Sequence, residues 1–422
     1  MVKLQKSWKK YISAMAGTAL LAAMLGTAVG AAATTTGIAT MDPYRIVAIG
    51  DSLTVGYEPG KSEKNIPYGF VDRLQEQGLL HGRSWTVNAG IAGLKSTGLL
   101  HYVEAVKAGQ PITADAIQPN LPDPRTPQIG AATAQTKADL ESADVITITI
   151  GGNDFMELIQ GATKLSEDEL NGRMEQLFKS YSDSMNTVIN DLHELSPKAL
   201  IVMADQYQPV PEIGDKVLYP KLMKAAASFT NLTDKLAAGY QTQGINVKVA
   251  HVAKEFVGSE GTMTHMIADR DIHPNQLGYE AMAKVFAESI WGSYSKQIVH
   301  EAGEPMGIIV SGKELNTPYK PVIRKNMNFV AIKDIVDAIG AKSTWDNKTS
   351  SATISYAGST VVVKIGASSV KVNGEVIPVA APAFLNKVGK ESKTYVPLAV
   401  LASGLGFDVQ YVPNLRTAFI NP

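Results

Sequence analysis

Gly50-Asp51-Ser52-Leu53 directly follows Tyr44-Arg45-Ile46-Val47-Ala48-Ile49, a largely apolar run. Such a run predicts a buried strand, and it places Ser52 just beyond the carboxyl end of that strand. A serine held there is rigid and accessible to a ligand, so it is a candidate nucleophile. Gly50 permits a sharp turn from the strand into a helix. The competing interpretation is that Ser52 only caps that helix.

Three further motifs follow in chain order. They are Asn88-Ala89-Gly90-Ile91-Ala92-Gly93, Gly151-Gly152-Asn153-Asp154 and His273-Pro274-Asn275. A serine hydroxyl is a weak nucleophile unless a base accepts its proton, and a histidine is the usual base. We therefore expect His273 to act on Ser52, with Asn275 as the cap of the helix that follows.

A serine, a glycine, an asparagine and a histidine, each in its own motif, resemble the SGNH (GDSL) family of serine hydrolases. The resemblance covers residues 43–298 and implies ester hydrolysis through an acyl-enzyme on Ser52, with no metal and no cofactor. It also implies an oxyanion hole made by the backbone N–H of Gly93 and the side-chain amide of Asn153. The alternative interpretations are a turn glycine and an Asx-turn.

The acid that orients the histidine departs from the family pattern. The family usually has an aspartate three residues before the histidine, and Arg270 occupies that position here. We expect Asp271 to hold the imidazole of His273, with Asp269 as the second choice. A third possibility is a backbone carbonyl in place of the acid. The other histidines, including His265, have no comparable context and no metal-ligand spacing.

Short apolar runs alternate with segments of helical spacing between residues 43 and 298. We predict strands at residues 46–49, 85–88, 145–150, 200–204 and 247–251, and helices at residues 68–80, 173–195, 221–241 and 277–294. This alternation predicts an α/β fold with a parallel sheet covered on both faces. The resemblance implies a flavodoxin-like three-layer sandwich with five strands. In the order 2-1-3-4-5, all four motifs meet at one edge of the sheet.

The proline-rich stretch at residues 107–128 shows no periodicity. We therefore predict that it is an inserted loop beside the site. The stretch at residues 299–305 has the composition of a linker.

The C-terminal region repeats itself. Phe329-Val330-Ala331-Ile332 corresponds to Tyr395-Val396-Pro397-Leu398 at a spacing of 66 residues, so we predict a smaller, duplicated α+β domain at residues 306–422. The region resembles the copper amine oxidase N-terminal-like domain, or stalk domain, which implies a spacer or attachment role. No histidine follows His300, which excludes a histidine-ligated copper site from this region.

The first 33 residues predict a secretory signal peptide. Four lysines within the first ten residues precede an apolar stretch and then a run of small residues. A transmembrane anchor is the alternative, because the apolar stretch approaches spanning length. We expect a secreted protein that is associated with the cell surface or wall through its stalk domain.

The composition excludes several classes of function. A net charge of −1 gives no basic excess for nucleic acid, and the absence of cysteine excludes disulfides, thiolate metal sites and a cysteine nucleophile. We expect a serine esterase or lipase that acts on a lipid or an acylated carbohydrate. Two alternatives remain. One is a non-catalytic surface-binding protein, which Arg270 favours, and the other is an acyltransferase that uses the same serine.

Overall fold

The computed structural model describes residues 42–61, 68–161, 165–214, 216–325 and 327–422. The predicted signal peptide lies outside these ranges. Within them, no helix is both long and apolar enough to cross a bilayer. Residues 39–422 form one compact unit, so the domain boundaries at residues 299–305 stay a prediction.

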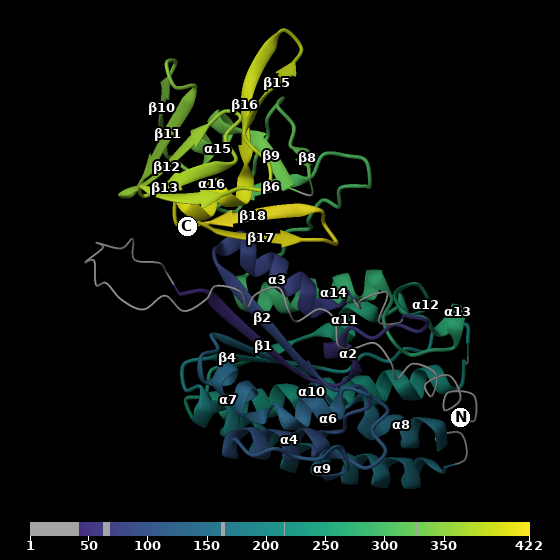
Figure 1. Ribbon diagram of the computed structural model, residues 1–422. Coiled ribbons are helices and arrows are strands. Elements are labelled where there is room, and N and C mark those ends of the chain that lie inside the picture. The colour runs from purple at the N-terminus through teal and green to yellow at the C-terminus, as the bar shows by residue number, and fades with distance from the viewer. Residues whose placement is uncertain (1–41, 62–67, 162–164, 215, 326) are drawn as a thin grey trace. The chain divides into compact units, whose positions relative to one another are not determined.

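Five parallel strands form the central sheet in the order β2-β1-β3-β4-β5, which is the predicted order (Figure 1). They are β1 (Tyr44–Gly50), β2 (Ser84–Gly90), β3 (Val145–Thr149), β4 (Leu200–Ala204) and β5 (Val247–Ala250). Each strand lies within two residues of its predicted bounds. The central strand β3 is buried along its whole length, as expected for a sheet covered on both faces.

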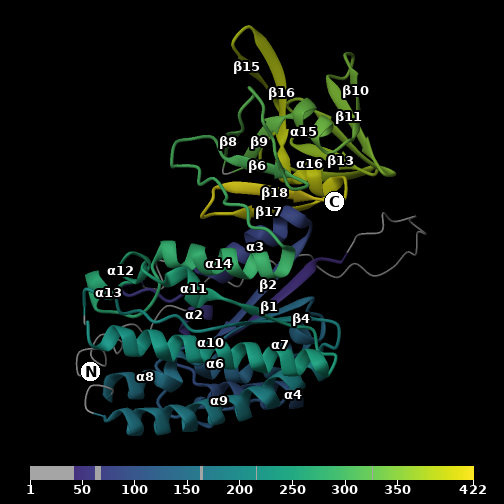
Figure 2. The same ribbon diagram turned by 180° about the vertical axis from the view of Figure 1, so that it is seen from behind.

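Helices cover both faces of this sheet and make a three-layer sandwich (Figures 1 and 2). One face packs against α3 (Phe70–His81), α11 (Val252–Phe256) and α14 (Gln276–Trp291). The other face packs against α4 (Ser96–Ala108), α7 (Thr133–Glu141), α9 (Glu167–Leu195) and α10 (Leu218–Thr242). Shorter helices lie in the connections: α2 (Ser52–Val55), α8 (Gly152–Gly161), α12 (Glu260–Met263) and α13 (Met266–Asp269).

The stretch at residues 107–128 is not wholly a loop, so that prediction was wrong in part. It contains the end of α4, the one-turn helix α5 (Ala114–Ile117) and the start of α6 (Thr126–Ala131). The Thr113 hydroxyl caps α5 by accepting a hydrogen bond from the N–H of Ala116. One turn is too short to show a helical period in the sequence.

The C-terminal region is mostly β-sheet. Its three sheets have the strand orders β10-β11-β12-β13-β14, β15-β16-β9-β8 and β17-β18-β6-β7. The bounds are β6 (Gly307–Val310), β7 (Lys313–Glu314), β8 (Val322–Arg324), β9 (Met327–Ala331), α15 (Ile332–Ala338), β10 (Lys342–Asp346), β11 (Ser351–Tyr356), β12 (Ser359–Lys364), β13 (Ser369–Val372), β14 (Glu375–Pro378), β15 (Phe384–Val388), β16 (Glu391–Pro397), α16 (Leu398–Gly404), β17 (Asp408–Val412) and β18 (Thr417–Asn421). The order β9-α15-β10-β11 occurs again as β16-α16-β17-β18.

The C-terminal region contacts the end of α3. Leu79 and Phe419 belong to one small apolar cluster. The Asn421 amide donates hydrogen bonds to the carbonyl oxygens of Leu79 (2.9 Å) and Gly82 (2.8 Å). These contacts combine apolar burial with directed hydrogen bonds, so they stabilise the attachment of the two regions.

Candidate active site

The turn after β1 presents Ser52. Gly50 has a φ of 139°, and a Cβ at this residue would overlap the carbonyl oxygen of Thr149 on β3, so only glycine fits. Asp51, not Ser52, caps α2, because its carboxylate accepts the N–H of Leu53 at 3.0 Å. The capping interpretation of Ser52 is therefore wrong, and its hydroxyl has another partner.

That partner is His273. The Nε2 atom of His273 lies 2.8 Å from Oγ of Ser52. On the other side of the ring, Nδ1 lies 2.6 Å from Oδ1 of Asp271, and the same oxygen accepts the backbone N–H of His273 at 2.9 Å. When Nδ1 carries the proton and donates it to Asp271, Nε2 is free to accept the proton of Ser52.

Asp271 is ionised in this arrangement. Its partial burial alone would raise its pKa, but the hydrogen bonds and the electrostatic interaction with His273 outweigh that effect and hold the pKa below its usual value. An ionised Asp271 stabilises the imidazolium that forms when His273 takes a proton.

Neither Arg270 nor Asp269 orients the imidazole of His273 in this structure. Arg270 has a φ of 55° and ends α13 in the left-handed conformation. Asp269 instead pairs with His265, whose Nδ1 lies 2.8 Å from Oδ2 of Asp269. The backbone N–H of His265 donates to the carbonyl oxygen of His273 at 3.0 Å. His265 thus contacts the segment that carries His273, which its sequence context did not predict.

Other contacts hold His273 in place. Asn275 caps α14, as predicted, by accepting the N–H groups of Leu277 (3.0 Å) and Gly278 (3.2 Å). The ring of Tyr57 meets the imidazole edge-on, with the ring centres 4.6 Å apart. The loop between α13 and α14 thus carries both Asp271 and His273 in a fixed position.

The predicted oxyanion residues lie in two neighbouring segments, Gly93 in the turn after β2 and Asn153 in the first turn of α8. Asn153 lines the same cavity as Ser52 and His273, and its amide donates to the carbonyl oxygen of Leu94 at 2.9 Å. An amide nitrogen has two hydrogens, so a second one can meet a substrate oxygen. Gly93 is not among the residues that line the cavity. Within the described ranges, no acceptor takes its N–H.

The turn at Gly93 requires glycine, and side chains of residues 107–128 support it by hydrogen bonds. Gly93 has a φ of 81°, and a Cβ there would lie 2.5 Å from Cδ of Pro122. The side chain of Gln118 donates to the carbonyl oxygen of Gly93 at 3.0 Å, and Asp123 accepts the N–H of Ala92 at 2.9 Å. The insertion at residues 107–128 therefore supports this turn.

Residues 48–281 match the GDSL-like Lipase/Acylhydrolase family, and this match covers more than half of the chain. The chain belongs to this family. It is accordingly a hydrolase that acts on ester bonds. Residues 309–420 match the Copper amine oxidase N-terminal domain.

Several proteins are similar to this GDSL hydrolase. The uncharacterized protein YpmR of Bacillus subtilis (strain 168) is 22% identical over 251 residues, which are 58% of this chain and 80% of that protein. The lipase Lip_vut3 from a goat rumen metagenome is 20% identical, with a TM-score of 0.42 over 58% of this chain and 97% of that one. The phospholipase A1 of Streptomyces albidoflavus NA297 is 16% identical, with a TM-score of 0.39 over 58% and 99%.

Asp51 adds a buried carboxyl group next to Ser52 of this hydrolase. Burial raises its pKa to about 7, although hydrogen bonds from the Leu53 N–H and the Thr149 hydroxyl oppose the rise. The hydroxyl oxygen of Thr149 also lies 2.7 Å from the hydroxyl oxygen of Thr54. This network has no signal in the sequence, because threonine in a strand is a common residue with no diagnostic spacing.

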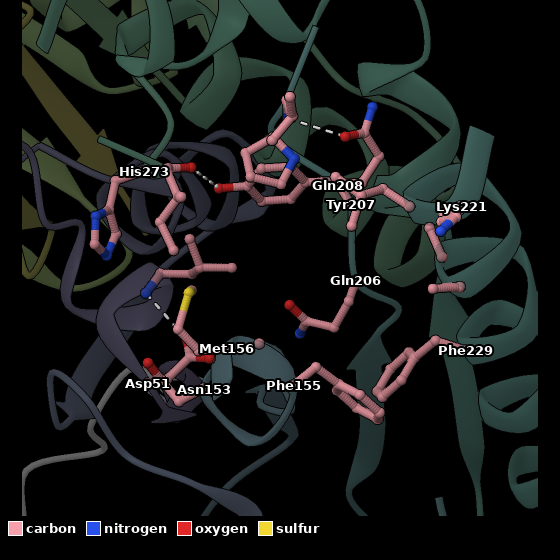
Figure 3. A pocket seen from close by; sticks show the side chains of 18 of the residues that line it. Asp51, Asn153, Phe155, Met156, Gln206, Tyr207, Gln208, Lys221, Phe229 and His273 are labelled. Carbon is pink, nitrogen blue, oxygen red and sulfur yellow. Dashed lines mark hydrogen bonds between the residues drawn. The ribbon is translucent and has the colours of Figure 1, made fainter. Parts of the chain in front are cut away.

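A cavity of about 350 Å³ opens beside Ser52 and His273. Its walls come from α8, α9, α10 and the segment after β4, which includes Tyr207 (Figure 3). The lining is mostly apolar: Phe155, Met156, Leu170, Met174, Phe178, Leu222 and Phe229 contribute to it. Sequence reasoning missed these residues, because apolar residues on a helix also predict ordinary core packing.

The part of the chain that the structure describes offers no candidate metal site. Among the described residues, no three histidine, aspartate or glutamate side chains are grouped as ligands for a metal ion.

Proposed function

We propose that this GDSL hydrolase is a secreted serine esterase that cleaves carboxylic esters through an acyl-enzyme. The observation that carries the proposal is the hydrogen-bonded chain from Ser52 through His273 to Asp271, beside the amide of Asn153. A nucleophile, a base and an orienting acid in this geometry are the parts that acyl transfer needs.

The reaction begins when His273 Nε2 takes the proton of Ser52 as its oxygen attacks the ester carbonyl carbon. The carbonyl oxygen becomes an oxyanion, which accepts hydrogen bonds from Asn153 and from backbone N–H groups of Gly93 and Ser52. His273 then returns its proton to the departing alcohol, and the acyl group stays on Ser52. Water attacks this ester with the help of His273 and releases the carboxylic acid.

The alternative in which the domain has lost catalysis rested on Arg270. Arg270 stands where the family usually has its aspartate, and it ends α13 in the left-handed conformation. Asp271, the next residue, contacts the imidazole instead. The arrangement therefore supports a working enzyme rather than a binding protein.

An acyltransferase would form the same acyl-enzyme and pass it to an alcohol instead of water. Incubation with p-nitrophenyl butyrate, with and without an added alcohol, distinguishes the two activities. The proposal expects butyric acid as the main product in both cases. A dominant butyrate ester of the added alcohol would support the transferase and contradict hydrolysis.

Export and surface attachment belong to the same proposal. The lysines, apolar stretch and small residues at the N-terminus support secretion, and the match to the Copper amine oxidase N-terminal domain supports an attached accessory module. We propose the cell surface or wall as its location. Fractionation of cells that express the full chain tests this. Recovery of the protein in the cytosolic fraction at full length would contradict it.

Covalent labelling of the nucleophile tests the chemistry directly. A phosphonate that reacts with activated serine should add one label per molecule, and peptide mass spectrometry should place that label on Ser52. Ser52→Ala should take up no label while keeping the melting temperature. A label on another residue of the wild-type protein would contradict the proposed nucleophile.

A further inference from the structure

The cavity beside Ser52 indicates a substrate class. We propose that it binds the acyl chain of the substrate, and that the enzyme prefers esters of unbranched fatty acids over acetyl esters. This inference rests on the proposed serine esterase activity. It goes further, because the family alone leaves lipids and acetylated carbohydrates open.

An aromatic cluster forms part of the cavity wall. The rings of Phe155 and Phe178 each meet Phe229 edge-on, with centre distances of 5.5 Å and 6.3 Å. Phe229 is 3% exposed. Such a wall offers dispersion contacts to a hydrocarbon chain and no hydrogen bonds to a sugar.

Small and flexible side chains leave room along this wall. Ala225 and Ala226 of α10 line the cavity, where larger residues would fill it. Met156 and Met174 line it as well, and the unbranched methionine side chain adapts to the shape of its neighbour. An acetyl group would leave most of this volume without contacts.

The amide nitrogens of two glutamines in the lining already have partners. The amide nitrogen of Gln206 donates to the carbonyl oxygen of Ile150 at 2.9 Å. The amide nitrogen of Gln208 donates to Glu260 at 2.9 Å. A site for a polar acyl group would need such donors to point into the cavity, since a buried unpaired polar group is unfavourable.

The position of His273 assigns the cavity to the acyl side of the ester. His273 must reach the oxygen of the departing alcohol to protonate it, so the alcohol lies next to the imidazole. In Figure 3, His273 lies at one side of the cavity, and Phe155 and Phe229 lie away from it, beyond Asn153. A chain that extends toward the phenylalanines is therefore attached to the carbonyl carbon.

The test is a chain-length series on the full-length protein. The substrates are p-nitrophenyl acetate, butyrate, octanoate and laurate, with Ser52→Ala as the blank. We expect kcat/KM to rise by up to about fourfold for each methylene until the cavity is full. Ala225→Phe should remove most of this gain, because the larger side chain fills part of the cavity that the acyl chain would occupy.

Two further variants complete the test, one as a control and one as a milder obstruction of the cavity. Ala238→Phe adds the same side chain at an exposed position of α10 outside the cavity, so it should keep the wild-type profile. Ala225→Leu is a smaller obstruction, for use if the phenylalanine variant does not fold. It should shorten the preferred chain.

The outcomes distinguish the acyl-chain assignment from the esterase activity on which it rests. Serine-dependent turnover with equal kcat/KM for acetate and octanoate would overturn the acyl-chain assignment and leave the esterase intact. A gain along a series of alkyl acetates, without one along the acyl series, would place the chain on the alcohol side and also overturn it. Turnover of no ester by the wild-type protein would overturn the esterase itself, and the acyl-chain assignment with it.

Discussion

Asp271, not Asp269, holds His273: its Oδ1 lies 2.6 Å from the imidazole Nδ1. Asp269 lies two residues earlier but binds His265 instead. The left-handed turn at Arg270 separates the two carboxylates and directs them to different histidines. The carboxylate that contacts the imidazole thus lies two residues before the histidine rather than three.

The two aspartates form a matched pair for mutagenesis. Asp271→Asn should lower kcat by about 10²–10⁴-fold, because an amide can stabilise the wrong tautomer of His273 and offers no charge to the imidazolium. Asp269→Asn should change kcat by no more than about threefold, since its carboxylate does not touch His273. Steady-state kinetics on one soluble ester measures both. Equal losses in the two variants would reject Asp271 as the orienting acid.

Replacement of Asn153 should lower kcat more than it changes KM. Asn153→Ala removes one donor to the oxyanion, so kcat should fall by about 10²–10³-fold with a smaller change in KM. The control is Asn190→Ala at an exposed position of α9. An Asn153→Ala enzyme with unchanged kcat would remove Asn153 from the oxyanion hole.

Asp51 makes stability depend on pH. Its pKa is raised from 3.8 to about 7 by burial, so the folded state binds a proton that the unfolded state releases between these values. Stability from this group is present below about pH 4 and falls as the pH rises through about 7. Asp51→Asn cannot ionise, so relative to the wild type it should gain free energy of unfolding at about pH 8, on the order of 1–4 kcal/mol.

Urea unfolding at several pH values measures this effect. The difference between Asp51→Asn and the wild type should grow between about pH 4 and pH 8, because the wild-type carboxylate becomes charged in a buried place. A difference that is constant over this range would contradict a raised pKa for Asp51.

The C-terminal region should support stability rather than catalysis. A chain ending at residue 300 should keep kcat/KM on a soluble ester within about threefold, because Ser52, His273 and the cavity lie within residues 43–298. Its melting temperature should fall by several degrees, because the cut removes the contacts that Phe419 and Asn421 make near Leu79. A truncated protein that is folded but inactive would contradict an accessory role.

Short apolar runs predicted the central sheet well. The inner strands β1, β3 and β4 are mostly buried and therefore apolar along most of their length, and β4 has its predicted bounds. The prediction failed at α5, where one helical turn is positioned by distant groups. Gln118, just after α5, binds Gly93, and such a contact between residues 25 positions apart leaves no periodic signal.

The site was predictable where one motif supplies one side chain. Ser52, His273 and Asn153 each stand in a motif of their own, and the sheet order brings these motifs to one edge. The choice between Asp271 and Asp269 depended on the backbone conformation of Arg270, which residue spacing does not reveal. The cavity was not predictable, because its lining comes from several helices and connections that lie far apart in the sequence.

The central claim is that Ser52 is the nucleophile of an ester hydrolase. The most direct measurement is kcat/KM for p-nitrophenyl butyrate with the wild-type protein and with Ser52→Ala, with thermal unfolding of both as the control. We predict a loss of about 10⁴-fold or more at an unchanged melting temperature. Turnover by folded Ser52→Ala within about tenfold of the wild type would contradict the claim.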